Sequence, residues 1–215
     1  MDTYRHKGLR KKLVEQLREK GITDEEVLDA INSIPRHLFL DNAFVNFAYQ
    51  DTAFPIGAGQ TISQPYTVAF QTQLLELEKG DKVLEIGTGS AYQTCVLVEM
   101  KAKVFSIERQ KLLFQRAKVI LPKMGYSAKL FFGDGYKGQP AFAPFDKIII
   151  TAGAPYIPED LKTQLKVGGL MVIPVGEGES QIMQRLRKIS ETEFEYEEYG
   201  DFKFVPLLQH KSFTN

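Results

Sequence analysis

The sequence has a single cysteine, Cys95, among its 215 residues. One cysteine excludes a disulfide within the chain, and it excludes the cysteine clusters that form structural metal sites. Cys95 itself lies in the apolar segment 94–98, so we interpret it as a core residue and not as a nucleophile. These features predict a protein of a reducing compartment with no metal site.

The sequence also lacks an excess of either charge, because Lys+Arg and Asp+Glu both number 27. This balance argues against the basic field of a nucleic-acid-binding protein. The densest basic run, residues 5–12, precedes Glu15 and Glu19 and fits the solvated face of a helix. We expect no nucleic-acid partner.

Long hydrophobic runs are absent as well. No stretch of about 18 apolar residues occurs, and the first residues do not resemble the apolar region of a signal peptide. We therefore expect a cytoplasmic protein with no membrane partner. The length suits one α/β domain over residues 1–215, with residues 1–80 as an extension and residues 81–215 as the sheet core.

The extension is predicted to be helical at both of its ends. Apolar spacing predicts a helix over residues 3–20, and Thr23 with Glu26 matches a capping box for a second helix that Pro35 ends. Residues 36–62 are irregular but rich in aromatic side chains, which favours an ordered lid or clamp. Ser63 is then a natural N-cap for a further helix.

The remainder alternates between strands and helices. This alternation predicts a doubly wound, mostly parallel seven-stranded sheet with helices on both faces. The final strands alternate apolar and polar residues and predict an antiparallel C-terminal edge. Predicted strands cover residues 82–86, 103–107, 128–132, 145–151, 170–175, 182–189 and 194–199, and residues 202–207 form a last extended segment.

The stretch 83–94 combines a buried strand, a glycine turn and the start of a helix. Gly87 and Gly89 allow backbone amides to come close to a ligand. Tyr92 stands where a dinucleotide-binding loop needs a small residue, so a nicotinamide or flavin dinucleotide is disfavoured. A single-nucleoside ligand such as S-adenosylmethionine stays possible, as does a purely structural turn.

Acidic residues lie at the ends of three predicted strands, and ligands of such sheets bind at the carboxyl ends of the strands. Glu108 lies where an acid would accept from ribose hydroxyls, although an acid at a helix start is the alternative. Asp134, between two glycines, could accept from an adenine amine or could simply form a turn. Glu85 interrupts an apolar strand and needs partners, which could be loop amides or, through water, a ligand ammonium.

These residues belong to motifs that resemble those of the protein-L-isoaspartate O-methyltransferases, which are S-adenosylmethionine-dependent repair enzymes. The resemblance runs over nearly the whole chain. The shared motifs are FPIG (54–57), GQTISQPY (59–66), residues 83–94, SIER (106–109), FDKIIITAGAP (145–155), LKVGG (165–169), VIPVG (172–176) and VPL (205–207). The TIS-x-P segment and the VPL tail are far more specific to this family than the glycine loop.

The resemblance implies transfer of a methyl group from S-adenosylmethionine to the free α-carboxylate of L-isoaspartyl residues in damaged proteins and peptides, with S-adenosylhomocysteine as product. By this resemblance, Ser63 is the catalytic residue at the substrate carboxylate. The residues expected to bind substrate are Thr61, Ile62, Val205 and Pro206. Expected cofactor-binding residues are Ile56, Gly57, Gly59, Gln60, Glu85, Gly87, Thr88, Gly89, Ser90, Glu108, Asp134 and Gly135. We expect a monomer.

The sequence departs from the family pattern at Ala58, Ala91, Gly153 and Leu208. These departures bear on affinity more than on reaction type. Two alternatives stay open from the residues alone. One is a methyltransferase for a small molecule or RNA on the same fold, and the other is a non-enzymatic nucleoside sensor.

Overall fold

The computed structural model describes residues 2–213. Its helices are α1 (Tyr4–Glu19), α2 (Glu25–Ser33), α3 (Pro65–Leu74), α4 (Tyr92–Glu99), α5 (Lys111–Lys123) and α6 (Glu159–Gln164), with short 3-10 turns η1 (Arg36–Phe39), η2 (Asn42–Phe47), η3 (Gly135–Lys137) and η4 (Pro140–Phe142). Its strands are β1 (Phe54–Gly57), β2 (Gln60–Ile62), β3 (Lys82–Ile86), β4 (Lys103–Glu108), β5 (Lys129–Phe132), β6 (Phe145–Ile150), β7 (Leu165–Val175), β8 (Gln181–Lys188) and β9 (Phe194–Phe202).

The main sheet has seven strands in the order β5-β4-β3-β6-β7-β8-β9. Strands β3 to β7 pair in parallel, whereas β8 and β9 run antiparallel to their neighbours. The predicted doubly wound sheet with an antiparallel C-terminal edge is therefore confirmed. The reversal between β3-β4 and β3-β6 makes a topological switch point beside β3, where ligands of open α/β sheets bind.

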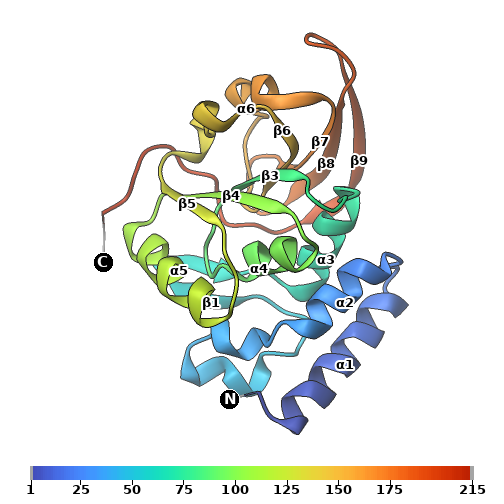
Figure 1. The fold of residues 1–215 in the computed structure, drawn as a ribbon, viewed down its shortest axis with the longest axis vertical. Coiled ribbons are helices and arrows are strands. Elements are labelled where there is room, and N and C mark those ends of the chain that lie inside the picture. The colour runs from blue at the N-terminus through green and yellow to red at the C-terminus, as the bar shows by residue number, and fades with distance from the viewer. Residues whose placement is uncertain (1, 214–215) are drawn as a thin grey trace.

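Helices cover the two faces of this sheet unequally (Figure 1). Helices α3, α4 and α5 lie on one face, with α1 and α2 packed outside them, and α6 lies on the other. On the α6 face, apolar side chains of β3, β4, β6 and β7 form a core that includes Leu161 of α6 and Leu207 of the C-terminal segment. None of the helices within residues 2–213 is long and apolar enough to cross a membrane.

Both N-terminal helices begin one residue later than the sequence predicts. Thr3 caps α1 in a capping box with His6. The predicted capping box at Thr23 is wrong, since Asp24 caps α2 by accepting from the amides of Glu26 and Val27. The Thr23 amide donates to the Gln73 side chain of α3 instead, so a contact between helices decides the capping position.

The aromatic segment 36–62 is ordered, as predicted, but it is not wholly irregular. It contains η1, η2 and the antiparallel hairpin β1–β2. Phe39, Phe54 and Ile56 from this segment are buried in a core that also contains residues of α1, α2, α4 and α5. The hairpin is therefore part of the packed structure, and it places residues 60–62 near the carboxyl ends of the central strands.

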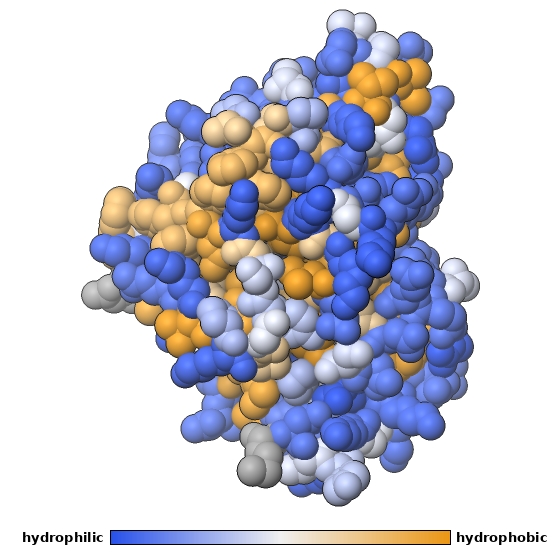
Figure 2. Space-filling view, viewed as in Figure 1, coloured by the Kyte–Doolittle hydropathy of each residue, from blue (hydrophilic) through white to orange (hydrophobic). Residues whose placement is uncertain are grey.

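The chain after β9 crosses the carboxyl ends of the parallel strands (Figure 1). Gly153, which follows β6, donates its amide to the Val205 carbonyl (2.9 Å) and accepts from the Leu207 amide (2.7 Å). Farther along, the amide of Ser212 donates to the carbonyl of Arg109, which follows β4 (2.7 Å). We call residues 203–213 the C-terminal strap. Apolar side chains gather on this side of the molecule around the middle of the sheet, whereas polar side chains dominate over α1 and α2 (Figure 2).

Candidate functional site

A cavity lies at the carboxyl ends of β3, β4 and β6, between the glycine loop, the end of the β1–β2 hairpin and the C-terminal strap. Its lining residues come from these segments and from the starts of α3 and α4. They are Gln60, Thr61, Ile62, Ser63, Val68, Ile86, Gly87, Thr88, Gly89, Ser90, Tyr92, Gln93, Ile107, Glu108, Arg109, Gly135, Thr151, Ala152, Val205, Pro206, Leu207 and Leu208. The sheet topology brings these distant segments together.

The glycine loop takes its shape from close packing against β6. Gly87 has φ +97°, and a Cβ atom there would lie 2.6 Å from the Thr151 hydroxyl oxygen. That hydroxyl donates to the Gly87 carbonyl (2.7 Å) and the Ile86 carbonyl (3.0 Å). A side chain at position 87 would disrupt this packing of the glycine loop against Thr151. Gly87 is therefore needed for packing as well as for the approach of a ligand to the backbone.

Glu108 ends β4 and lies in the cavity wall. One carboxylate oxygen accepts from the Gly89 amide (2.8 Å) and the other from the Gln110 amide (2.7 Å). Burial raises the pKa of this carboxyl group, and the two amides oppose that rise. The carboxylate is therefore held rigidly beside the glycine loop, where its remaining lone pairs can accept from a diol.

Glu85 lies outside the cavity lining. Its carboxylate points to α4 and accepts from the Thr94 hydroxyl (2.6 Å), and the side chain is fully buried. Burial raises the pKa of Glu85 to about 7, because desolvation disfavours the charged form. Its expected role toward a ligand ammonium through water stays a prediction.

Asp134 also lies outside the cavity, although its neighbour Gly135 lines it. The Asp134 carboxylate accepts from the Tyr136 amide (3.0 Å) and from the His210 amide of the strap (2.8 Å). Both oxygens therefore accept from backbone amides in this structure. Asp134 thus forms a turn, which is the alternative role that the sequence offered. The expected contact with an adenine amine stays a prediction.

Ser63 lines the cavity, but it is not a helix cap. Helix α3 begins at Pro65 with Gln64 in the capping position, so the predicted N-cap at Ser63 is wrong. Within residues 2–213 the Ser63 hydroxyl has no hydrogen-bond partner, whereas its carbonyl accepts from Arg36 (2.7 Å). The X-Pro geometry of Gln64-Pro65 starts the helix one residue later than predicted and leaves this hydroxyl available to a ligand.

The other expected site residues divide between the cavity and the layer behind it. Thr61, Ile62, Val205 and Pro206 line the cavity, as do Gln60, Thr88 and Ser90. Ile56, Gly57 and Gly59 do not line it. Ile56 lies behind the glycine loop, where a Cβ atom on Gly89 would be 3.7 Å from its Cδ1 atom.

Thr151 and Arg36 were not predicted as parts of this site. Thr151 is the last residue of the predicted strand 145–151, so the strand-end rule that selected Glu108 could also have selected it. No local pattern marks Arg36, because its importance comes from burial against Ser63.

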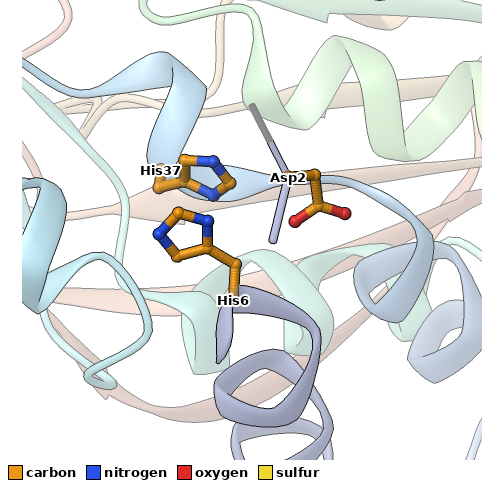
Figure 3. Close-up of side chains that lie close together, drawn as sticks. All are labelled: Asp2, His6 and His37. Carbon is orange, nitrogen blue, oxygen red and sulfur yellow. The ribbon is translucent and has the colours of Figure 1, made fainter. Parts of the chain in front are cut away.

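Among residues 2–213, one cluster of side chains has metal-ligand chemistry: Asp2, His6 and His37 (Figure 3). Their candidate ligand atoms all lie within 4.8 Å of one another. The protein already uses several of these atoms, because Arg10 contacts both Asp2 oxygens and the Thr3 amide donates to His6 Nδ1. A nitrogen that accepts from an amide leaves the proton of a neutral imidazole on the other nitrogen, which disfavours His6 as a metal ligand.

A family model now decides the relationship of this chain to known proteins. The model described as protein-L-isoaspartate(D-aspartate) O-methyltransferase matches residues 8–212. The chain belongs to this family. Membership of a methyltransferase family confirms that the protein is an enzyme and confirms the resemblance drawn from the motifs.

Bacterial members of the protein-L-isoaspartate O-methyltransferase family are similar along their whole length. The protein-L-isoaspartate O-methyltransferase of Flavobacterium psychrophilum is 64% identical over 212 residues, which are 98% of this chain and 99% of that protein. The same-named protein of Cytophaga hutchinsonii is 61% identical over 207 residues, 96% of this chain and 94% of that protein.

Solved structures of the family share the fold. A protein-L-isoaspartate O-methyltransferase structure superposes with a TM-score of 0.83 at 30% identity and covers 92% of this chain, which spans 65% of that longer chain. A structure of a putative family member from Plasmodium falciparum, in complex with S-adenosyl-L-homocysteine, gives a TM-score of 0.82 at 25% identity. It covers 93% of this chain and 98% of that chain.

Proposed function

We propose that this enzyme transfers a methyl group from S-adenosylmethionine to the free α-carboxylate of L-isoaspartyl residues in damaged proteins and peptides. One observation carries the proposal beyond family membership. The Ser63 hydroxyl, free of any capping role, lines the same cavity as Gly87, Gly89 and Glu108. The hydroxyl that could donate to a substrate carboxylate and the residues suited to bind a nucleoside therefore line the same cavity.

The cavity wall suits S-adenosylmethionine by the chemistry of its donors and acceptors. Glu108 offers carboxylate oxygens to a ribose diol, and the loop from Gly87 to Ser90 offers backbone amides beside the start of α4. The bound cofactor supplies a methyl group on a sulfonium, which is activated toward nucleophiles without help from the protein. We propose that Gln60, Thr88, Ser90 and Gly135 complete its binding site.

The acceptor needs no general base. A peptide α-carboxyl group has a reference pKa of about 3.5, so it is ionised and nucleophilic at neutral pH. No histidine is among the residues that line the cavity, which agrees with this requirement. Ser63 can donate one hydrogen bond that orients a carboxylate oxygen toward the methyl group, so catalysis rests on alignment.

A second, larger cavity adjoins the first and provides room for the substrate chain. Its volume is about 720 Å³ and its wall shares Thr61, Ser63, Thr151 and Val205 with the first cavity. We propose that the isoaspartyl peptide lies here, with Thr61, Ile62, Val205 and Pro206 around the acceptor. Contacts from extended segments through the main chain tolerate many side-chain sequences, which a repair enzyme requires.

The deciding experiment measures tritiated methyl transfer to a synthetic isoaspartyl peptide, with the matching aspartyl peptide as control. We expect transfer to the isoaspartyl peptide only. Ser63→Ala should lower kcat by about tenfold to a hundredfold, because loss of one orienting hydrogen bond to a charged group costs about 1.5–3 kcal/mol. The dissociation constant of S-adenosylhomocysteine should stay unchanged.

Glu108→Ala should have the opposite effect from Ser63→Ala on cofactor binding. This variant should weaken S-adenosylhomocysteine binding in calorimetry, because it removes the acceptor at the end of β4. No methyl incorporation into either peptide by the unaltered enzyme would refute the proposed substrate.

We also propose that the enzyme works as a cytoplasmic monomer that does not bind nucleic acid. The balance of 27 basic and 27 acidic residues supports the last point. Light scattering at micromolar concentration tests the oligomeric state, and a dimer mass would contradict it.

A further inference from the structure

Arg36 is the largest side chain that is fully buried in this protein, with an exposed fraction of 0%. Across residues 2–213 it forms no ion pair, and its Nε and Nη1 atoms have no hydrogen-bond partner. Burial lowers the pKa of Arg36 to about 10, so the guanidinium is still charged at neutral pH. An isolated buried charge is costly, and its retention calls for a specific role.

The hydrogen bonds and the ring contact of Arg36 all go to residues in the walls of the two cavities. Its Nη2 atom donates to the Ser63 carbonyl (2.7 Å) and, more weakly, to the Thr52 carbonyl (3.4 Å). The guanidinium carbon lies 4.8 Å from the centre of the Tyr92 ring. Ser63 and Tyr92 line the first cavity and Thr52 lines the second, whereas Arg36 lines neither. Arg36 therefore lies directly behind the site and acts through these neighbours.

Asp51 holds the same segment from its other end. Its carboxylate accepts from the Tyr66 amide (2.8 Å) and the Gln64 side chain (3.1 Å). Lys20 forms an ion pair with Asp51 at 2.5 Å, and Asp51 also attracts the Arg36 guanidinium without forming an ion pair with it. Residues 63–66 are thus fixed at both ends, with the Arg36 guanidinium on the Ser63 side.

The turn that carries Arg36 is itself held in place. The adjacent residue, His37, stacks on His6 of α1 with 3.8 Å between ring centres (Figure 3), and its Nδ1 atom lies 2.7 Å from the Tyr49 hydroxyl. Arg10 of α1 in turn donates to that hydroxyl (3.2 Å). The N-terminal helix therefore fixes η1, and with it the position of the Arg36 guanidinium.

We propose that Arg36 is a positioning residue for the methyl acceptor, which fixes the backbone of Ser63 and places a positive charge behind the point where the substrate carboxylate binds. This inference rests on the proposed function. The two effects act on different kinetic constants. The contact with Ser63 controls alignment and should act on kcat.

The charge of Arg36 should act on KM for the peptide. Methyl transfer neutralises the carboxylate, so a positive charge stabilises bound substrate more than the transition state. A substitution that keeps the charge should therefore leave KM for the peptide unchanged. A substitution that removes the charge should raise KM.

The experiment compares Arg36→Lys, which keeps the charge, with Arg36→Met, which removes it at similar volume. We expect Arg36→Lys to lower kcat by about tenfold with KM for the isoaspartyl peptide unchanged, as expected for a lost aligning contact. Arg36→Met should lower kcat by less than Arg36→Lys does and should also raise KM by about tenfold, because it removes a charge interaction that favours bound substrate over the transition state in a poorly hydrated site. Neither variant should change the dissociation constant of S-adenosylhomocysteine.

Lys188 of β8 provides the control. It is a buried cation too, at 2% exposure, and it donates to the Leu165 carbonyl (2.9 Å) and to Glu191 (2.8 Å), neither of which lines either cavity. Lys188→Met should lower thermal stability and leave kcat and KM unchanged. Equal losses of activity and stability in the Lys188 and Arg36 variants would overturn the positioning role.

A double substitution separates this inference from the function on which it rests. In a Ser63→Ala background, Arg36→Lys should lower kcat by less than twofold further, because the aligned group is gone. A full tenfold loss in that background would overturn the inference and leave the isoaspartyl activity standing. An unaltered enzyme without isoaspartyl activity would overturn both.

A measurement on the unaltered protein covers the case in which the Arg36 variants do not fold. With S-adenosylhomocysteine bound, the NMR signal of the Arg36 guanidinium should shift on addition of the isoaspartyl peptide and stay in place with the aspartyl peptide. An unchanged guanidinium signal at saturating isoaspartyl peptide would contradict the proposal.

Discussion

At the scale of single residues, the chemistry of this site depends on which polar groups are free and which are already engaged. The Ser63 hydroxyl has no partner within residues 2–213, while both oxygens of Asp134 accept from backbone amides. Glu108 and Glu85 are both buried acids, yet only Glu108 lines the cavity. Residue type alone does not distinguish these cases, because hydrogen-bond partners from distant segments decide them.

Glu85 gives a prediction for stability against pH. Its folded pKa of about 7 lies above the usual value of 4.5 for a glutamate, so the folded state holds the proton more tightly than the unfolded chain. The stabilisation is complete below pH 4.5 and is lost as the pH rises through 7, by up to roughly 3 kcal/mol at about 1.4 kcal/mol per pH unit. Glu85→Gln cannot lose a proton, so it should be more stable than the parent at pH 8 and similar to it at pH 5.

Urea unfolding of parent and variant at both pH values measures this difference. Glu19→Gln, on the exposed face of α1, is the control, and its difference in stability from the parent should be the same at both pH values. A Glu85→Gln variant with the same stability gap at pH 5 and pH 8 would contradict the raised pKa.

At the scale of elements, the C-terminal strap closes the site. Val205, Pro206, Leu207 and Leu208 line the cavity, and the cavity volume is only about 70 Å³. Drug-sized ligands occupy pockets of about 300–1,000 Å³, so we expect the strap to move outward when the cofactor enters. Its hydrogen bonds to residues that follow β4, β5 and β6 therefore set the cost of opening.

Tyr136→Phe tests this opening. The Tyr136 hydroxyl donates to the Leu207 carbonyl (3.1 Å), and loss of one such bond costs about 0.5–1.5 kcal/mol. Stopped-flow measurements should show association and dissociation of S-adenosylhomocysteine both accelerated by about twofold to tenfold. Hydrogen exchange in residues 205–212 should rise in parallel.

Tyr156→Phe is the matched control for the strap. Its ring lies 5.9 Å from that of Tyr136, but its side chain is about half exposed and donates no hydrogen bond to the strap. This variant should keep the rates of the parent. Unchanged rates in Tyr136→Phe would show that the strap does not limit entry.

At the scale of the whole molecule, the extension and the sheet core share one hydrophobic core. The largest cluster joins Leu17 and Ile31 of the N-terminal helices to Tyr92 of α4 and Leu113 of α5. We propose that residues 1–80 and 81–215 form a single cooperative domain because neither part buries its apolar face without the other.

Calorimetry tests that cooperativity. We expect one thermal transition with equal calorimetric and van't Hoff enthalpies. S-adenosylhomocysteine at a hundred times its dissociation constant should stabilise the folded state by about 2.7 kcal/mol if it binds the folded state alone. Two separate transitions would contradict a single domain.

The parallel sheet, its antiparallel edge and the order of its elements could be predicted because they follow from local hydrophobic periodicity. The strand ends that carry Gly87 and Glu108 were located for the same reason. The helix starts at Thr23 and Ser63 were mispredicted. The Thr23 amide bonds Gln73 from α3, and the start after Ser63 is set by Pro65.

The sequence by itself determined the fold class, the family and the identity of the residues that meet at the strand ends, since periodicity and motifs are local properties of the chain. Only the tertiary structure decided which of those residues face the cavity. Glu85 turns to α4, Asp134 holds the strap, and Arg36 reaches Ser63 across 27 positions of sequence. Burial and hydrogen bonding between distant segments produce these outcomes, and no local pattern encodes them.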